Sequence, residues 1–293
     1  MTRHATRVPH AGRPDRDDPV ALEGRLQPEE LFRFSGRIVT VQTGRMRPVA
    51  PITPVVLETR ESPGGVPGRS TSERSAGVKV RFHPQSMAER SNLWWLTAAI
   101  YEPLWRKHST RILTHGTWTL EEECRIVAGM LAPVRGGSYL DAGCSAGLYA
   151  RAIQAGEPEA GVILVDYSLP MLKKAVSKAD PDARGVYLQC DMGVLPIADR
   201  CLDGAVMGGT LNELTEPEKV LSEMARVLKK NATAVVMHLV RDGRPGLLSR
   251  SLKPGGVWIP DENDADALFL GAGFELVDSR RAGVMRILQL LKT

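Results

Sequence analysis

The pattern of apolar and polar positions along the chain changes near residue 86. Before this point, short apolar runs at 38–41 and 55–57 are interrupted by prolines, and a Gly-, Ser- and Pro-rich stretch follows at 62–77. After it, apolar runs of strand length alternate with longer segments of helical periodicity. Such alternation is typical of an α/β fold with a doubly wound, mostly parallel sheet and helices on both of its faces.

Two parts of the chain are therefore expected. Residues 1–85 form a basic, Pro- and Gly-rich N-terminal extension, with few large apolar groups to offset the entropy of ordering. We expect this extension to be partly disordered or to fold as a small β appendage. Residues 86–293 form the α/β domain.

Individual elements of the α/β domain follow from the same pattern. The expected strands are Ser138–Asp141, Gly161–Asp166, Val186–Cys190, Gly204–Met207, Ala232–Leu239, Phe274–Asp278 and Val284–Leu291. The expected helical segments are Met87–His108 with a break or kink at Pro103, Thr119–Leu131, Ala146–Ala155, Pro170–Lys178, Glu216–Lys229 and Asp261–Leu270. Thr119 and Glu122 have the spacing of a capping box, which predicts a helix start there.

Composition and charge narrow the class of protein. Hydrophobic residues make up 43% of the chain and charged residues 25%, as in ordinary globular proteins. The net charge of +4 is too small to indicate a nucleic-acid-binding protein, and residues 1–85 account for it with 14 Lys and Arg against 9 Asp and Glu. The longest apolar run, Leu93–Ile100, is shorter than the roughly 20 residues of a transmembrane helix. We expect no transmembrane segment.

Two further expectations concern the compartment and the cysteines. No apolar segment of secretory type follows the N-terminal arginines, so a cytoplasmic protein is expected; organelle targeting is the alternative, although serine is lacking there. The cysteines are Cys124, Cys144, Cys190 and Cys201. Their spacing matches neither a metal site nor a disulfide framework, so we expect reduced thiols and no bound metal.

Residues that follow the expected strands carry the candidate chemistry, because ligands of a doubly wound sheet bind at the carboxyl ends of its strands. Gly143 and Gly147 follow the first strand of the α/β domain and permit a tight turn. Asp166 follows the second strand, 23 residues beyond Gly143, at about the distance where an acid reaches ribose hydroxyls. Asp191 and Met192 follow the third, where a carboxylate can accept from an exocyclic amine. Asp166 can equally cap the helix that follows it.

These segments resemble the successive motifs of a known family. The resembling segments are Tyr139–Arg151, Val162–Ala175, Gln189–Ile197, Leu202–Met207 and Arg226–Val236, with the phrases LDAGCSAGLYAR, VDYSLPMLKKA, CDMGVLPIAD and EMARVLKK. They are similar to class I S-adenosylmethionine-dependent methyltransferases, nearest to the small-molecule branch that includes ubiquinone/menaquinone methyltransferase-like enzymes. The resemblance implies a seven-stranded Rossmann-like sheet whose last strand is antiparallel, and S-adenosylmethionine as cofactor.

Roles in cofactor binding follow from the resemblance. It implies that Asp141 meets the ammonium group of the methionine part, Asp166 the ribose hydroxyls and Asp191 the adenine amine. The implied set is Asp141, Gly143, Ser145, Gly147, Asp166, Tyr167, Asp191, Met192 and Gly208. Ser145 departs from the family pattern, which has a glycine there. Serine is small and can cap the following helix, so we expect binding to be retained.

The acceptor side is less marked, because methyl transfer from a sulfonium needs alignment more than an obligatory nucleophile. Asn212, Glu213 and His238 follow the fourth and fifth strands and are the candidate catalytic residues, with His238 as a general base. Their alternatives are helix capping for Asn212 and Glu213, and a structural hydrogen bond for His238.

Substrate contacts are expected from two aromatic lid segments. Tyr101 and Trp105 in the first and Trp258 in the second are the candidate pocket walls. Their apolar character favours a small apolar or aromatic acceptor such as a quinone, a polyketide or a lipid-like precursor.

Three alternative functions can be compared with this one. A nicotinamide dehydrogenase is excluded because the loop 143–149 lacks Gly-x-Gly-x-x-Gly. An RNA methyltransferase using residues 1–85 as a basic arm remains open, although the arginines there are interleaved with acids. A member that binds the cofactor without transferring methyl also remains open. We thus expect a small-molecule acceptor as partner rather than nucleic acid; oligomerisation is left open.

Overall fold

The structure is a computed structural model that describes residues 107–241 and 257–293 and, before them, residues 21–22, 25, 27–28, 38–40 and 55–56. The predicted aromatic lid with Tyr101 and Trp105 lies outside the described residues, as does most of the second lid segment. Trp258 is described. Among the described residues, none of the helices combines the length and the apolar character needed to cross a membrane.

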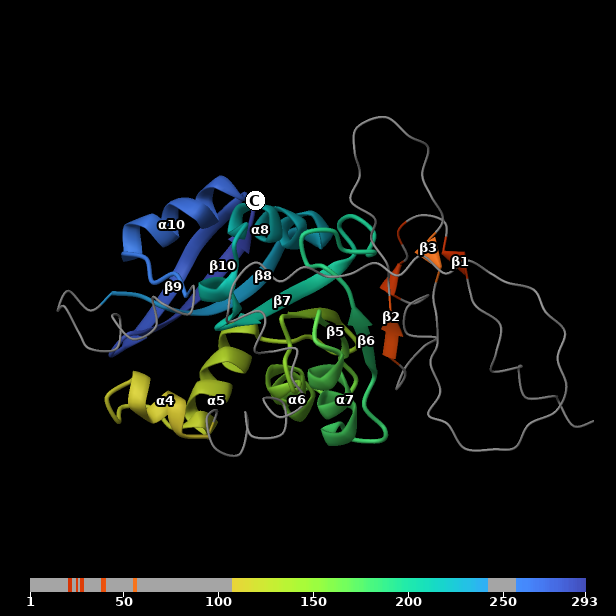
Figure 1. Ribbon diagram of the computed structural model, residues 1–293, viewed down its shortest axis with the longest axis horizontal. Coiled ribbons are helices and arrows are strands. Elements are labelled where there is room, and N and C mark those ends of the chain that lie inside the picture. The colour runs from red at the N-terminus through yellow and green to blue at the C-terminus, as the bar shows by residue number, and fades with distance from the viewer. Residues whose placement is uncertain are drawn as a thin grey trace, which may run out of the picture.

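A twisted sheet forms the middle layer of the α/β domain (Figure 1). Its strands from Ser138 onward are β4 (Ser138–Ala142), β5 (Gly161–Asp166), β6 (Gly185–Gln189), β7 (Leu202–Gly208), β8 (Leu228–Leu239), β9 (Phe274–Ala282) and β10 (Met285–Lys292). They lie in the order β6-β5-β4-β7-β8-β10-β9. Neighbouring strands from β6 to β8 pair in parallel, and β10 runs antiparallel to both β8 and β9. The predicted doubly wound, mostly parallel sheet with a reversed last strand is confirmed.

Strand order reverses beside β4. The chain passes from β4 to β5 and β6 on one side and then returns to β7 and β8 on the other. The carboxyl ends of β4 and β7 therefore flank the topological switch point, where open α/β sheets bind their ligands.

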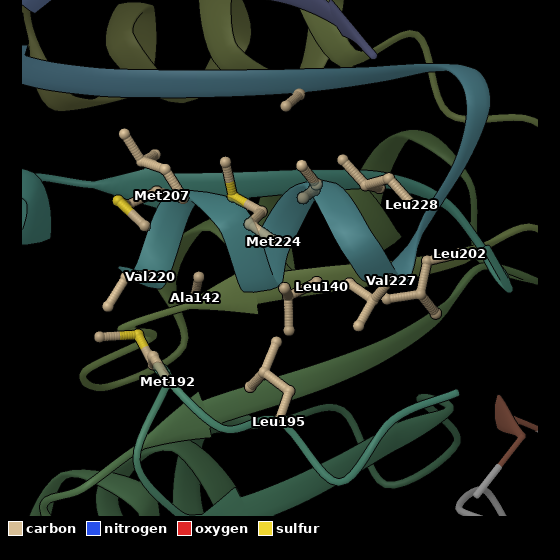
Figure 2. Packing of buried hydrophobic residues seen from close by; sticks show 14 of the residues in the cluster. Leu140, Ala142, Met192, Leu195, Leu202, Met207, Val220, Met224, Val227 and Leu228 are labelled. Atoms are coloured by element: carbon tan, nitrogen blue, oxygen red, sulfur yellow. The ribbon is translucent and has the colours of Figure 1, made fainter. Parts of the chain in front are cut away.

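Helices cover both faces of the sheet (Figure 1). They are α4 (Lys107–Leu113), α5 (Leu120–Leu131), α6 (Leu148–Gly156), α7 (Leu169–Lys178), the 3-10 turn η3 (Thr210–Glu213), α8 (Pro217–Val227) and α10 (Glu262–Gly271). One core cluster joins the sheet to α8 and α10, and the other joins it to α5, α6 and α7. In Figure 2, Val220, Met224 and Val227 of α8 lie beside Leu140 of β4 and Met207 of β7, at the helical spacing that buries one face.

Two boundaries show how local and tertiary signals compete. Thr119 and Glu122 form the predicted capping box at the start of α5, with Thr119 N–H donating to the Glu122 carboxylate at 2.7 Å and Glu122 N–H to Thr119 Oγ1 at 3.2 Å. The helix expected to reach Lys229 instead ends at Val227, because Leu228 pairs with Leu202 and begins β8.

All four cysteines lie within the described residues, and none of them joins another in a disulfide.

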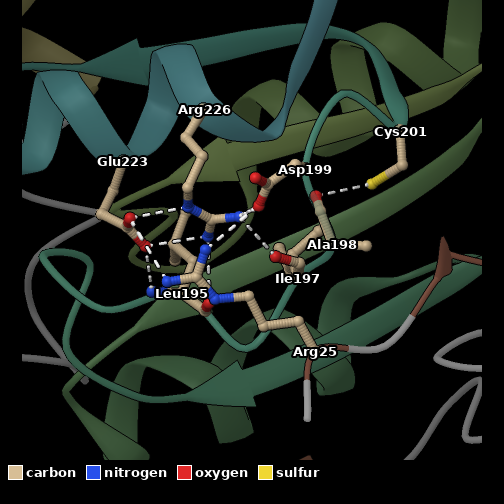
Figure 3. A network of polar contacts seen from close by, with 8 residues as sticks. All are labelled: Arg25, Leu195, Ile197, Ala198, Asp199, Cys201, Glu223 and Arg226. Atoms are coloured by element: carbon tan, nitrogen blue, oxygen red, sulfur yellow. Dashed lines mark hydrogen bonds and ion pairs between the residues drawn. The ribbon is translucent and has the colours of Figure 1, made fainter.

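Described parts of the N-terminal extension contact the sheet edge. Strand β2 (Ile38–Thr40) pairs in parallel with β6 and adds an eighth strand to the sheet, and β1 (Ala21–Leu22) pairs antiparallel with β3 (Val55–Val56). Arg25 reaches Asp199 at 3.1 Å and Glu223 at 3.8 Å, two carboxylates that also bind Arg226 of α8 (Figure 3).

Arg226 is the centre of this network. Its guanidinium donates to the carbonyl oxygens of Leu195 and Ile197 at 3.1 and 2.8 Å, and Glu223 accepts from Leu195 N–H at 2.8 Å. The network therefore fixes the segment that leads away from the end of β6, directly after Asp191.

Candidate cofactor and active site

The turn between β4 and α6 has the backbone that its glycines predict. Gly143 and Gly147 have φ angles of 70° and 73°, in the left-handed region that glycine adopts without strain. The N–H groups of Gly143 and Cys144 donate to the Val165 carbonyl at 2.9 and 3.0 Å. The turn is thus tied by its own backbone to the end of the neighbouring strand β5.

Ser145 lies in this turn but does not cap the helix. It has a φ of 45°, and the N-cap of α6 is Gly147, whose position makes no side-chain cap bond. The prediction that Ser145 caps α6 is wrong, because the helix starts only at Leu148. Instead, the N–H of Ser145 donates to Asp166 Oδ2 at 2.8 Å.

Asp166 links two loops at the end of β5. Its Oδ2 accepts from Ser145, and its Oδ1 accepts from Ser168 N–H at 2.8 Å. Ser168 itself is the N-cap of α7, so Asp166 supports the entry into that helix without capping it. Each carboxylate oxygen has a second lone pair, so the side chain can accept further hydrogen bonds from ribose hydroxyls.

Asp141 is the second buried acid beside the turn. Its side chain is 1% exposed at the end of β4, and Oδ2 accepts from Ala150 N–H of α6 at 3.1 Å. Burial, together with the nearby charge of Asp166, raises the pKa of Asp141 to about 7, against the lowering effects of the Ala150 hydrogen bond and of Arg151. Burial likewise raises the pKa of Asp166 to about 6. Two carboxyls destabilised as anions by burial form a site that favours a cationic ligand.

The predicted cofactor residues after β5 and β6 differ in their exposure to solvent. Asp191 is exposed, and its Oδ1 accepts from Gly193 N–H at 2.8 Å, which leaves its other oxygen accessible for a ligand amine. Met192 packs into the core cluster with Leu195 (Figure 2). Tyr167, after β5, is half-buried, and its carbonyl accepts from a glutamine side chain at the end of β6.

Gly143 and Gly208 are needed for a reason that only the packing shows. A Cβ at Gly208 would overlap the ring of Tyr149, and a Cβ at Gly143 would overlap Thr210. The Thr210 hydroxyl donates to the Gly143 carbonyl at 3.3 Å. Side chains from α6 and η3 thus pack directly against the ends of β4 and β7.

Asn212 holds two chain segments together. Its Nδ2 donates to the carbonyls of Leu239 and Trp258 at 2.9 and 2.7 Å, and its Oδ1 accepts from Leu239 N–H at 2.7 Å. The Trp258 N–H also donates to the Asn212 carbonyl at 2.7 Å. The structure thus brings the predicted catalytic Asn212 and the predicted substrate residue Trp258 together, while Glu213 lies half-buried in η3.

His238 lies inside the core at the end of β8. Its side chain is fully buried, and its ring packs edge-on against the ring of Phe269 in α10, with 5.9 Å between the ring centroids. Neither ring nitrogen has a hydrogen-bond partner among the described residues. Burial, with the positive charge of Arg286, lowers the pKa of His238 to about 4, so the imidazole is neutral near pH 7.

Sequence reasoning missed the buried acid of α5 and its partners. Glu123 is fully buried and binds the hydroxyls of Thr110 and Tyr149. A signal was present, because Glu123 occupies the apolar face of α5 at helical spacing from Val127 and Met130. Among the described residues, no group of three or more His, Cys, Asp or Glu side chains is arranged to hold a metal ion.

Comparison with known proteins identifies the domain. Residues 140–236 match the family model described as a methyltransferase domain. The chain carries a methyltransferase domain. The matched segment of this domain contains every residue predicted to bind the cofactor, and also Asn212 and Glu213; it ends before His238 and Trp258.

Similar proteins agree with the assignment of the methyltransferase domain. An uncharacterized chloroplastic methyltransferase of Arabidopsis thaliana is 26% identical over 175 residues, which cover 58% of this chain and 48% of the relative. A demethylmenaquinone methyltransferase of Roseiflexus sp. is 30% identical over 130 residues, 44% of this chain and 54% of the relative. The chain thus spans about half the length of these curated relatives.

A solved structure shows the same fold. The S-adenosylmethionine-dependent methyltransferase of Aquifex aeolicus superposes with a TM-score of 0.53 at 20% identity and covers 68% of this chain and 99% of that one. The match to the methyltransferase domain thus confirms the resemblance over residues 140–236, and the solved structure confirms the fold.

Proposed function

We propose that this protein transfers a methyl group from S-adenosylmethionine to a small acceptor. The observation that carries the proposal is the pair of buried carboxyls, Asp141 and Asp166, on either side of one glycine turn at the switch point of a methyltransferase domain. S-adenosylmethionine carries an ammonium and a sulfonium. Such a cation suits a site whose two acids are destabilised as anions by burial.

The residues present fit this cofactor. In the proposed complex Asp141 binds the ammonium group, the backbone of 143–147 lies along the methionine part, and Asp166 accepts from the ribose hydroxyls. Asp191 accepts from the adenine amine with its accessible oxygen. When bound, the cofactor supplies an electrophilic methyl group. The chain aligns it with the acceptor and excludes water, which is the main source of acceleration for a displacement of this kind.

We further propose a small apolar or aromatic acceptor of the quinone, polyketide or lipid-like class. The relatives named demethylmenaquinone methyltransferase support the quinone within this class. In this proposal the side chain of Trp258, whose backbone carbonyl Asn212 binds near the end of β8, contacts the acceptor. The alternatives, an RNA substrate or a bound cofactor without transfer, have no supporting observation in the described residues.

Calorimetric titration tests the cofactor. We expect micromolar-scale binding of S-adenosylmethionine and S-adenosylhomocysteine and no binding of NADH. Asp166→Ala should weaken binding about tenfold or more, since a hydrogen bond to a charged group contributes roughly 1.5–3 kcal/mol. Asp180→Ala is the matched control, because Asp180 accepts a similar backbone hydrogen bond from Asp182. It lies in the loop before β6, away from the carboxyl ends of the strands. An Asp166 variant that binds like the wild type would overturn the ribose assignment.

Incubation with labelled cofactor tests the acceptor. We expect label to enter a demethylated naphthoquinone but neither free amino acids nor RNA. Transfer to RNA that weakens steeply with salt would favour the nucleic-acid alternative. Tight cofactor binding without transfer to any acceptor class would favour the member that does not transfer methyl.

A further inference from the structure

Three helices meet at one buried carboxylate beneath the cofactor turn. Glu123 of α5 is fully buried, and its Oε2 accepts from the Thr110 hydroxyl of α4 at 2.6 Å. Its Oε1 accepts from the hydroxyl of Tyr149 in the first turn of α6. A single carboxylate therefore connects α4, α5 and α6.

Tyr149 extends this connection to the switch point. It lies two residues after Gly147, the N-cap of α6, so its backbone belongs to the first turn of the helix that follows the turn we assign to cofactor binding. Its ring packs so closely on Gly208, at the carboxyl end of β7, that a Cβ there would overlap it. The ring thus packs against the carboxyl end of β7, beside the switch point.

A buried acid at this position is costly for stability alone. Burying a carboxylate carries a desolvation penalty, and well-packed apolar residues often replace buried ionic groups with no loss of stability. The other inward-facing positions of α5, Val127, Met130 and Leu131, are apolar. The hydroxyl contacts of Glu123 instead fix the orientation of one aromatic ring, which an apolar side chain would leave to rotate.

We propose that Glu123 is a positioning residue for cofactor binding, acting through the hydroxyl of Tyr149 to hold that ring against Gly208 and the turn after β4. The inference rests on the proposed function, since it assigns a role in a site for S-adenosylmethionine. Glu123 itself touches neither the cofactor nor the acceptor. It acts on the site through the tyrosine ring.

Four variants test the proposal by calorimetric titration with S-adenosylhomocysteine. Tyr149→Phe keeps the ring and removes the hydroxyl, and we expect its dissociation constant to rise about three- to tenfold. Glu123→Leu removes the carboxylate at similar volume and should give a similar rise. Glu123→Gln should stay within about threefold of the wild type, because an amide can still pair with two hydroxyls.

Thr119→Ala is the matched control for stability. It removes the N-cap of α5 without touching Glu123, so it should lower the melting temperature while leaving the dissociation constant unchanged. If Thr119→Ala weakens binding as much as Glu123→Leu does, Glu123 acts only through helix stability and the inference is wrong.

Failure of the inference and failure of the proposed function are distinguishable. A wild-type protein that binds neither S-adenosylmethionine nor its demethylated product overturns both. A wild type that binds, together with Tyr149→Phe and Glu123→Leu variants that bind equally well, overturns the positioning role alone. Tyr149→Phe keeps the test decisive if Glu123→Leu does not fold.

Discussion

Asp141 and Asp166 combine a role in the turn with the proposed role in binding. Each accepts a backbone N–H from the segment that forms the turn or the helix after it, so the turn is shaped by the acids that are to hold the ligand. Their pKa values, raised by burial to about 7 and about 6, place their ionisation close to physiological pH.

Cofactor affinity should therefore depend on pH. A bound cation favours the ionised carboxylates, so we expect affinity for S-adenosylmethionine to rise between about pH 5 and 8, with protons released on binding near pH 6 to 7. Calorimetry in two buffers of different ionisation enthalpy measures this release. Asp141→Asn should reduce it, and an affinity that is flat over the whole range would contradict the electrostatic role.

Stability should change with pH in the opposite direction. Both acids have folded pKa values above the ordinary value of 3.8, so the folded state binds more protons between about pH 4 and 7. Their contribution to the free energy of unfolding is then largest below pH 4 and is lost as pH rises through 6 and 7. Urea unfolding of the wild type and Asp141→Asn across this range would show a weaker decline in the variant.

The sequence predicts the position of a single residue where chain order alone decides it. Asp141 and Asp166 lie at the ends of β4 and β5, and Gly143 and Gly147 follow β4, so all four lie at the carboxyl ends of the strands, where such sheets bind ligands. The contact between Glu123 and Tyr149 could not be predicted, because it depends on how α5 packs against α6.

At the scale of elements, β8 and its neighbours enclose two polar groups that the sequence suggested for catalysis. His238 is enclosed between β8 and α10, where Arg286 pairs with Asp266 at 2.6 Å and lies opposite His238 in the sheet register. Asn212 joins η3 to the end of β8. The structural roles of His238 and Asn212 could not be predicted from the sequence. The residues at the end of a strand do not indicate whether a helix covers that end or leaves it open to a ligand.

His238 should make the protein sensitive to acid. Its pKa is lowered from 6.5 to about 4 in the folded state, so the unfolded state binds more protons between these values and stability falls as pH drops through this window. His238→Leu should lose less unfolding free energy than the wild type between pH 7 and 5, by about 2 kcal/mol at most. The exposed His108 offers the control His108→Gln, for which we expect no such difference.

Asn212 gives a second prediction at this scale. Removing its three side-chain hydrogen bonds in Asn212→Ala leaves buried backbone groups unpaired and should cost roughly 1–3 kcal/mol. Asn212→Asp keeps the size but cannot donate, so it should be destabilised as well. Thermal unfolding measures both. Unchanged melting temperatures combined with lost turnover would instead favour the catalytic role.

For the whole molecule, the alternation of strands and helices predicted the layers, and the family resemblance implied seven strands with the last one reversed. Neither predicted that β2 would extend the sheet beyond β6, because the short apolar run at 38–41 does not indicate which strand it pairs with. The contacts of Arg25 with Asp199 and Glu223 were equally invisible, since they join positions nearly two hundred residues apart.

The network of Figure 3 predicts unequal effects for its two arginines. Arg25 is half-exposed and pairs with the well-exposed Asp199, so Arg25→Ala should cost less than about 1 kcal/mol. Arg226 also holds the carbonyls of Leu195 and Ile197, and Arg226→Ala should cost roughly 2 kcal/mol or more. Chemical denaturation of both variants measures the contrast, and equal losses would mean that the extension contributes more than its ion pairs indicate.

Cys144 gives the turn after β4 a reporter of its own. Its thiol is buried within the turn, and burial, with the charges of Asp166 and Asp141, raises its pKa well above the ordinary value. The thiolate is the nucleophile that attacks an alkylating reagent, so labelling of Cys144 requires the turn to open first. The rate at which iodoacetamide modifies Cys144 then measures how often the turn opens. A ligand that holds the turn closed must slow this reaction in proportion to the fraction of protein that has the ligand bound.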